Sequence, residues 1–377
     1  MRIKRILVWC VPLTSHVAYH MASGKTCDTV ETAVLAIETD TGHTGWGEVC
    51  PIPHYLPAYA RGVAPVVQEL APVLLRADPR GPEAMGASLD AWLQDHRYAK
   101  SAIDIALWDL TAQAAGMPLY SLLGGLRQAV LPLYHSSTCV ETDEMARFAR
   151  EAFAAGIRQF QAKLGADADW EADVARLRLV REAVGQGPLF YGDWNCGATS
   201  LEATRIGRAV ADLDVMLEQP CRSNAENARV KAVTGLPMKL DEGVHDTDSL
   251  LEASALGIID AAAVKLSKFG GISASRRARD LCLHLGVKMR RRYLGVRHNH
   301  GGRAASGGGD GPTVRAECLR SVGLCLTKAG WGRAGQARWH DHGAGWRRIG
   351  NNRGPGPPWR ARSYAGLAAI LGRGDGR

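Results

Sequence analysis

The sequence contains five short apolar runs that each end in a charged residue: Phe160-Gln-Ala-Lys163, Leu189-Phe-Tyr-Gly-Asp193, Asp214-Val-Met-Leu-Glu218, Met238-Lys-Leu-Asp241 and Ala262-Ala-Val-Lys265. The charged residues follow one another at intervals of 30, 25, 23 and 24 residues. Segments with a helix-like pattern, such as 169–184 and 200–213, lie between the runs. A repeated strand and helix of this length is typical of a parallel α/β fold.

The five charged side chains are predicted to gather at one edge of the sheet, because consecutive parallel strands lie side by side and their carboxyl ends meet. Asp193, Glu218 and Asp241 would repel one another strongly without a cation. Oxygen ligands alone, in this number, favour Mg²⁺. A single strand-end acid is more often a helix cap or a surface residue, but five in phase indicate a metal site. Lys163 and Lys265 would flank that site as two bases.

The charge of the chain is unevenly distributed. The formal net charge is +8, yet residues 290–377 hold 17 Lys and Arg against 4 Asp and Glu. Residues 1–289 hold 29 against 34 and therefore resemble an ordinary enzyme. The basic end alone would suit nucleic acid. However, it has neither regular helical spacing of Arg nor zinc-ligand spacing, so we expect no nucleic-acid partner.

The N-terminus leads directly into a strand-like segment, and no apolar run reaches 18 residues. We therefore expect neither a signal peptide nor a membrane span. The nine cysteines include no C-x-x-C pair, which favours reduced thiols in a cytoplasmic protein. Cys50, Cys196 and Cys221 fall near the expected site, and we interpret them as packing residues rather than nucleophiles.

The first part of the chain has a different pattern. Strand signals dominate residues 1–60, with a hairpin turn at 39–44. Helical patterns fill 61–124, and the clearest runs from Lys100 to Gly116, where glycine and then Pro118 stop the helix. We place an α+β domain at residues 1–125 and the α/β repeat at 126–289, opening with a strand near Val130.

Several motifs then follow in order: GWGE at 45–48, YAKSAIDIALWDL at 98–110, LLGG at 122–125, Asp193-x-Asn195, Glu218-Gln219-Pro220, Asp241-Glu242 and Lys265-x-Ser-Lys-x-Gly-Gly271. Over about residues 1–289 the ordered set resembles the enolase superfamily, in its mandelate racemase and muconate lactonizing branch. The resemblance implies a modified (β/α) barrel covered by the N-terminal α+β capping domain. It also implies a homo-oligomer when the chain is intact.

The resemblance further implies Mg²⁺ on Asp193, Glu218 and Asp241, with Lys163 and Lys265 facing each other across the substrate. The shared reaction is abstraction of the proton next to a carboxylate, with Mg²⁺ as Lewis acid. A lysine base needs a lowered pKa, which burial and a nearby cation both favour.

Other residues are predicted near this chemistry. Gln161 shares the strand face of Lys163, stands where many relatives have lysine, and is expected to orient Lys163 or the carboxylate. Asn195 is expected either to bind substrate or to cap the next helix. Tyr55 is either a substrate-binding residue of the capping loop or a surface aromatic. Lys268 lies three residues after Lys265, so in a strand the two side chains would point to opposite faces. Lys268 is therefore predicted to be a loop or surface lysine.

Two opposed lysines allow two outcomes. One lysine could remove a proton while the other returns one on the opposite face, which gives racemisation or epimerisation. Alternatively, the second lysine protonates a leaving β-hydroxyl, which gives anti dehydration. The segments at 37–59 and 98–105 most resemble the cis-3-hydroxy-L-proline dehydratases of this superfamily, with the hydroxyproline betaine 2-epimerases close behind. The expected substrate is thus a small amino-acid-like carboxylate.

The tail departs from the family. After Val287-Lys288-Met289 a seventh barrel strand is expected, but an Arg-rich, Gly-rich sequence follows. With suitable codons, residues 290–302 read one base later give VEDTWGSDITTA, which resembles the missing strand. We therefore expect a frameshift near codon 290, a barrel of six strands truncated at its C-terminal end, and an inactive chain as written. A genuine basic tail is the alternative.

Overall fold

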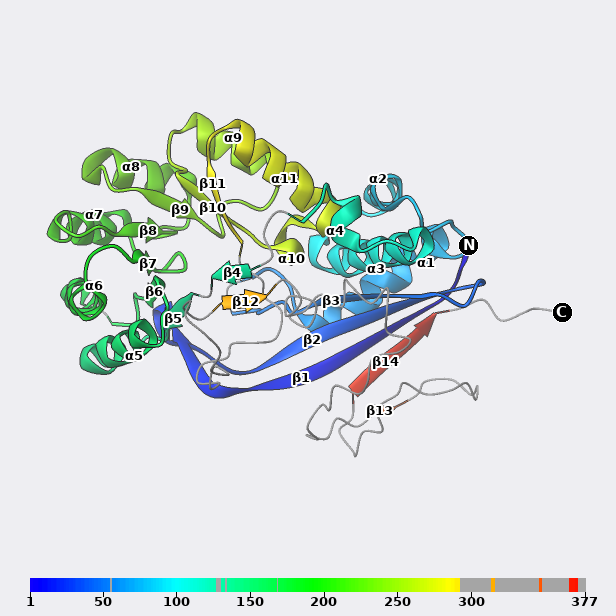
Figure 1. Cartoon of the computed structure of the whole chain (residues 1–377), viewed down its shortest axis with the longest axis horizontal. Coiled ribbons are helices and arrows are strands. Elements are labelled where there is room, and N and C mark those ends of the chain that lie inside the picture. Colours follow the sequence, from blue (N-terminus) through cyan, green and yellow to red (C-terminus); the bar gives the residue numbers. More distant parts are fainter. Residues whose placement is uncertain are drawn as a thin grey trace.

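The computed structural model describes residues 1–54, 56–126, 130–132, 134–167, 169–291, 313–315, 346–347 and 366–371. Figure 1 shows an antiparallel sheet with helices at one end and a curled parallel sheet lined by helices at the other. The predicted combination of an α+β part and a truncated (β/α) barrel is confirmed.

The N-terminal part is built on a long antiparallel ribbon. Strands β1 (Ile3–Met21) and β2 (Lys25–Thr39) pair along their length, and β3 (Thr44–Val49) follows β2 through the predicted hairpin turn. The helices of this part are α1 (Val63–Leu74), α2 (Pro82–Trp92), α3 (Arg97–Ala115) and α4 (Leu119–Leu122). Helix α3 ends at Gly116, which has a φ of +62° and so suits the left-handed end of a helix.

Helix α3 lies unusually close to strand β3, and two glycines make this possible. A Cβ atom on Gly47 would lie 1.9 Å from the carbonyl oxygen of Ala102, and one on Gly45 would lie 2.2 Å from that of Ala106. The buried carboxylate of Asp109 accepts a hydrogen bond from the backbone N–H of Trp46 at 2.9 Å. The two motifs GWGE and YAKSAIDIALWDL are therefore in direct contact.

The second part is a parallel sheet in the order β11-β10-β9-β8-β7-β6-β5. Its strands are β5 (His135–Ser137), β6 (Gln159–Lys163), β7 (Leu189–Asp193), β8 (Met216–Glu218), β9 (Met238–Leu240), β10 (Ala261–Val264) and β11 (Lys288–Arg291). The helices along it are α5 (Thr142–Ala154), α6 (Trp170–Val184), α7 (Ser200–Ala209), α8 (Asn224–Thr234), α9 (Thr247–Ala255), α10 (Leu266–Phe269) and α11 (Ile272–His284).

Two expectations about the ends of this sheet are corrected. Six strands were expected up to residue 289, but β11 pairs in parallel with β10 and continues to Arg291, which makes a seventh described strand. The pairing of Lys288 with Ala261 sets the register, and the next residues follow it. At the other end, β4 (Val130–Pro132) does not open the parallel sheet, because it pairs antiparallel with β12 (Thr313–Arg315).

Of the tail, the structure describes only β11's last residues and three short strands. Besides β12 these are β13 (Trp346–Arg347) and β14 (Gly366–Leu371), and β14 pairs antiparallel with β1. The frameshift prediction concerns residues that otherwise lie outside the described part, so it stays a prediction.

Local sequence explains where the helices of the parallel part begin. Thr199 and Ser223 each form a capping box, in which the hydroxyl accepts from the backbone of a glutamate three residues later. Asp169 and Asp246 cap α6 and α9 in a similar way. Each cap satisfies backbone N–H groups that have no partner within the helix.

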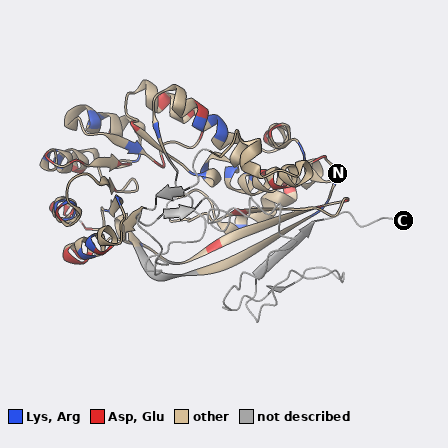
Figure 2. Cartoon of the chain, viewed as in Figure 1, with Lys and Arg blue, Asp and Glu red and all other residues tan. Residues whose placement is uncertain are grey.

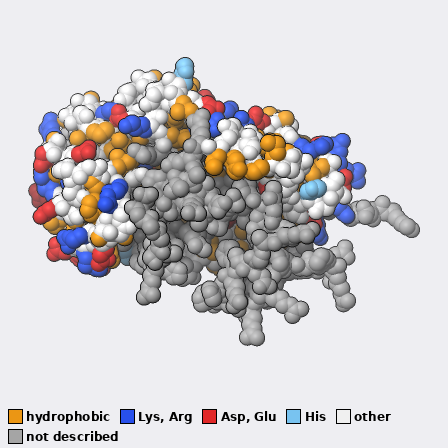
Figure 3. Space-filling view, viewed as in Figure 1, with side chains coloured by type: hydrophobic (Ala, Val, Ile, Leu, Met, Phe, Trp, Pro, Cys, Tyr) orange, Lys and Arg blue, Asp and Glu red, His pale blue; other side chains and the backbone are white. Residues whose placement is uncertain are grey.

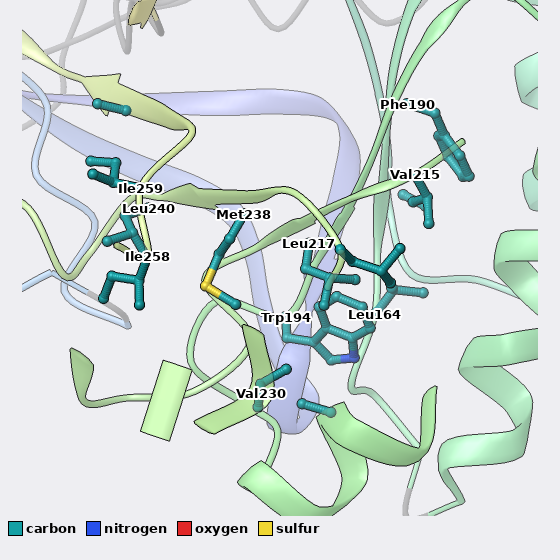
Figure 4. Packing of buried hydrophobic residues seen from close by; sticks show 14 of the residues in the cluster. Leu164, Phe190, Trp194, Val215, Leu217, Val230, Met238, Leu240, Ile258 and Ile259 are labelled. Atoms are coloured by element: carbon teal, nitrogen blue, oxygen red, sulfur yellow. The ribbon is translucent and has the colours of Figure 1, made fainter. Parts of the chain in front are cut away.

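The core of this part lies between the sheet and its helices. Figure 4 shows Leu217 and Met238 from the strands near Trp194 and Val230, and Phe190 beside Val215. Complete burial of a side chain of this size contributes about 1.5–3 kcal/mol. Charged residues lie mainly on the surrounding helices, with both signs interspersed (Figures 2 and 3). Among the described helices, none has the length and apolar character needed to cross a membrane.

Candidate active site at the strand ends

The five charged residues of the repeat lie at the carboxyl ends of adjacent strands, as the sequence predicted. Lys163 on β6 is paired in register with Asp193 on β7, which is paired with Glu218 on β8. Asp241 follows β9, and Lys265 follows β10. The three carboxylates are 0% exposed, and both lysines are at most 2% exposed. The row is therefore a buried cluster of charge and not a solvated surface.

Lys163 joins two of the predicted residues. Its Nζ lies 2.6 Å from Asp193 Oδ2 and 2.5 Å from Asn195 Oδ1. The amide nitrogen of Asn195 donates to Glu242 Oε1 at 3.0 Å. Asn195 does not cap the next helix, because Thr199 does so. Its positive φ of 44° turns the chain at the strand end and places the side chain among the charged groups.

Gln161 bridges two carboxylates. Its amide nitrogen donates to Asp193 Oδ2 at 2.7 Å and to Glu218 Oε2 at 2.5 Å, while its carbonyl accepts from Ser136 Oγ at 2.7 Å. Gln161 thus contacts two acids of the row, and its predicted role as a substrate-binding residue that orients Lys163 or the carboxylate stays a prediction. Since one donor reaches both acids, these two carboxylate oxygens face the same small space.

Lys268 is not a surface lysine, contrary to the sequence prediction. Its side chain is 4% exposed, and its Nζ contacts both the backbone oxygen and the Oδ1 of Asp241. Lys265 Nζ lies 2.6 Å from the other carboxylate oxygen of Asp241. The parity argument failed because α10 begins directly after Lys265. Residues three apart in a helix share a face, whereas residues three apart in a strand do not.

Lys239 is a member of the cluster that the sequence reasoning missed. Its Nζ lies 3.0 Å from Glu218 Oε1 and 4.4 Å from the centre of the Tyr191 ring. A signal was present, because Lys239 precedes Asp241 by two residues and therefore points to the same side of β9.

Gln219 holds the acidic strand ends in place and was likewise missed. Its side chain is completely buried, and its Oε1 accepts from the backbone N–H groups of Asp241 at 3.0 Å and Gly243 at 2.9 Å. It has a φ of +39°, a left-handed conformation that is uncommon for a residue other than glycine. The Glu218-Gln219-Pro220 tripeptide thus connects the end of β8 to the end of β9.

Burial also shifts the protonation of groups beside the row. Desolvation lowers the pKa of Lys268, although the carboxylate of Asp241 acts in the opposite direction. Desolvation, followed by the negative charge of Asp241, raises the pKa of Glu242 to about 7. Removing one partner of such a buried ion pair typically costs about 3–5 kcal/mol. Each buried carboxylate of the row is therefore balanced by the positive charge of a neighbouring lysine.

The donor set suits a hard cation, because it consists of buried carboxylate oxygens on adjacent strand ends. The close convergence expected of the three acids is nevertheless not found. Within the described ranges, no group of three Asp, Glu, His or Cys side chains is spaced to hold a metal ion. Amine and amide nitrogens instead contact every one of these carboxylates.

The N-terminal part contacts the segment of α10 and α11, which directly follows Lys265 and contains Lys268. Asp104 of α3 accepts from Ser273 at the start of α11, from the backbone N–H at 3.0 Å and from Oγ at 2.5 Å. Trp108 Nε1 donates to the same hydroxyl at 2.9 Å. A Cβ atom on Gly271 would lie 2.4 Å from Asp104 Oδ2, so only glycine fits there. These contacts fix the turn between α10 and α11.

The remaining predictions have simple outcomes. Tyr55 lies outside the described residues, so its expected contact with substrate stays a prediction. Cys50, Cys196 and Cys221 are free thiols, and burial raises the pKa of Cys50 and of Cys221 to about 12. Burial also raises the pKa of Cys196. These directions agree with packing residues and oppose nucleophiles.

The chain combines a capping α+β part with a curled parallel sheet, and a row of acids between lysines lies at the strand ends. This combination is the architecture of an enzyme. Comparison with known families agrees: residues 3–124 match the mandelate racemase / muconate lactonizing enzyme N-terminal domain, and residues 144–298 match the enolase C-terminal domain-like family. The chain belongs to the enolase superfamily, in its mandelate racemase / muconate lactonizing enzyme branch.

Individual relatives differ in activity. The cis-3-hydroxy-L-proline dehydratase of Roseibium aggregatum is 38% identical over 272 residues, which are 72% of this chain and 74% of the relative. The hydrophobic dipeptide epimerase of Enterococcus faecalis is 29% identical over 76% of this chain and 81% of its own. A superfamily member from Roseovarius nubinhibens, solved with magnesium, has a TM-score of 0.72 at 33% identity, covering 76% of this chain and 78% of its own.

Proposed function

We propose that this enzyme removes the proton next to the carboxylate of a small amino-acid-like substrate, with Mg²⁺ as cofactor. We propose cis-3-hydroxy-L-proline as the substrate and its dehydration to Δ1-pyrroline-2-carboxylate as the reaction. The observation that carries the proposal is the buried row in which Lys163 and Lys265 flank three adjacent strand-end acids. The relative of 38% identity named a cis-3-hydroxy-L-proline dehydratase supports the choice of substrate.

Asp193, Glu218 and Asp241 would hold the metal. Bound there, Mg²⁺ would supply Lewis-acid stabilisation of the negative charge that develops on the substrate carboxylate. The Roseovarius nubinhibens structure that was solved with magnesium supports the choice of metal. Gln161 would then keep Asp193 and Glu218 turned toward a common point, as it does through its hydrogen bonds to both.

The two lysines would move the protons. In cis-3-hydroxy-L-proline the α-hydrogen and the 3-hydroxyl lie on opposite faces of the ring. One lysine would accept the α-proton, and the other would protonate the departing hydroxyl as water. Lys163 is the last residue of β6 and Lys265 follows β10, with three strands between them, so they approach from opposite ends of the row. Asn195 would position Lys163 and bind substrate.

Epimerisation of a proline derivative, such as hydroxyproline betaine, is the second candidate. It needs the same two lysines, with the second one returning a proton to the opposite face of the α-carbon. The 29% identical relative named a dipeptide epimerase favours this alternative. A cytoplasmic location and a homo-oligomer remain predictions.

Proton NMR in D₂O tests the proposal and separates the two reactions. Dehydration of cis-3-hydroxy-L-proline would yield the pyrroline product, whereas epimerisation would yield an α-deuterated substrate of inverted configuration. Lys163→Ala and Lys265→Ala should each abolish turnover, and Lys231→Ala, at the surface pair with Asp260, should not. The assays should use both the chain as written and a version with its frame restored from codon 290. Normal turnover by either active-site variant would remove that lysine from the mechanism.

A further inference from the structure

Tyr98 is a buried residue of the capping part whose hydroxyl has no evident structural role. It lies at the start of α3 and is 8% exposed. Its hydroxyl oxygen is inaccessible to solvent and makes no hydrogen bond within the described part of the chain. A buried hydroxyl without a partner gives up its hydrogen bonds to water without replacing them, and phenylalanine would fill the same space without that cost.

The surroundings of this hydroxyl belong to the candidate site. The charges that act on it most strongly are those of Lys265, Asp241 and Glu242. Burial raises the pKa of the Tyr98 hydroxyl, so it keeps its proton at neutral pH and can donate. The start of α3 lies beside the segments that follow β9 and β10. Arg97, the residue before Tyr98, pairs with Asp246 at 2.8 Å, and a Cβ atom on Gly270 at the end of α10 would lie 3.8 Å from Arg97 Cβ.

A second buried polar atom near the same charges also lacks a partner. Glu242 Oε2 has no hydrogen bond among the described residues, although Glu242 Oε1 accepts from Asn195. Native proteins satisfy most buried polar groups, so two unpartnered atoms near the Lys265 end of the row call for a common explanation. A polar ligand that binds between them would supply it.

We propose that Tyr98 is a substrate-binding residue supplied by the N-terminal part. Its hydroxyl donates a hydrogen bond to an oxygen atom of the bound amino-acid-like substrate, either in the carboxylate group or in the 3-hydroxyl. This inference rests on the proposed function and extends it, because it assigns a substrate contact on the Lys265 side of the site. The Tyr98 position opens the motif at 98–110. Asp104 and Asp109 of that motif anchor α3 to α11 and β3, and Tyr98 gives the anchored helix a direct role in binding.

The test compares wild type with Tyr98→Phe, which keeps the ring and removes only the hydroxyl. Tyr120→Phe is the matched control, because Tyr120 lies on α4 and is 38% exposed. For the titrations all three proteins also carry Lys163→Ala, which stops turnover at the far end of the row. Calorimetric titration in Mg²⁺ should then give a dissociation constant for cis-3-hydroxy-L-proline about tenfold or more higher with Tyr98→Phe, with the control unchanged. Titration with L-proline, which lacks the 3-hydroxyl, identifies the acceptor. A loss with both compounds assigns the carboxylate, and a loss with the hydroxylated compound alone assigns the 3-hydroxyl.

The melting temperature of the ligand-free protein gives an independent readout. Tyr98→Phe should be at least as stable as wild type, because no hydrogen bond is lost. Equal affinity of Tyr98→Phe and wild type would overturn the inference. If wild type binds neither compound, the proposed function fails. In that case a lower melting temperature of Tyr98→Phe would show that the hydroxyl has a structural role, and it would overturn the inference as well. An unchanged or higher melting temperature would support a different ligand at the same hydroxyl.

Discussion

Lys265 and Lys268 donate to opposite oxygens of the Asp241 carboxylate, so a single acid at the end of β9 is held between two buried ammonium groups. The two lysines are one helical turn apart, and they reach the same acid because α10 starts at the strand end. One of them is the proposed proton carrier. The other fixes the acid and contributes positive charge beside it.

Replacement of Lys268 by methionine should therefore lower stability. The variant loses hydrogen bonds to the carboxylate and the backbone oxygen of Asp241. As one partner of a buried ion pair is removed, we expect a cost of about 3–5 kcal/mol in the free energy of unfolding. Urea denaturation measures it. Lys231→Met, which removes a partly exposed pair with Asp260, should cost about 0–1 kcal/mol. Equal costs for the two variants would contradict a buried anchoring role for Lys268.

Magnesium should stabilise the protein through the three strand-end acids. A cation that binds only the folded state at 100 times its dissociation constant adds about 2.7 kcal/mol. The rise in melting temperature on addition of Mg²⁺ should be lost in Asp193→Asn and in Asp241→Asn. It should persist in Asp212→Asn, which affects only a surface pair with Arg178. A rise that survives the first two substitutions would place the metal elsewhere.

Asp104 should make stability depend on pH. Burial raises the pKa of its carboxyl from 3.8 to about 6, against the hydrogen bonds from Ser273. An acid whose pKa is higher in the folded state favours folding below its unfolded pKa and loses that contribution as pH rises through the folded pKa. Between pH 4 and pH 7 wild type should thus lose stability relative to Asp104→Asn, by on the order of 3 kcal/mol. Urea unfolding of both proteins across this range measures the difference, and a constant difference would refute the shift.

Gly47 should tolerate no side chain. In Gly47→Ala the new methyl group would collide with the backbone of Ala102, so α3 would have to move away from β3. We expect a loss of about 1–3 kcal/mol or more. Gly86→Ala is the control, because Gly86 lies inside α2 and a methyl group there would have no atom within 4 Å apart from its chain neighbours and the nearby backbone of its own helix. That variant should be neutral or up to about 1 kcal/mol more stable. Thermal unfolding of both variants distinguishes the two environments.

The reading frame near codon 290 gives a final prediction. Resequencing across codons 285–295 should reveal a one-base change, and the chain as written should turn over little substrate. Restoring the frame should raise turnover of a hydroxyproline substantially. An unaltered gene that encodes a fully active enzyme would show that the basic tail is genuine.

The sequence alone determined the strand-end row and the order of the elements. Apolar runs, two-residue strand parity and cap residues such as Thr199 and Ser223 are local features, and local features specify which residues end a strand or begin a helix. The positions of Lys163, Asp193 and Glu218 at matching levels of adjacent strands follow from that pattern.

Only the tertiary structure decided which distant groups meet these residues. Lys268 contacts Asp241 because the chain changes from strand to helix at Lys265. Residues three apart then share a face, whereas in a strand they would point to opposite faces. Asp104 meets Ser273 across 169 residues of sequence, and the start of α3 with Tyr98 lies beside the segments that follow β9 and β10. The contacts of Asp104 and Tyr98 depend on how the N-terminal part packs against the parallel part, and periodicity within either part carries no information about that packing.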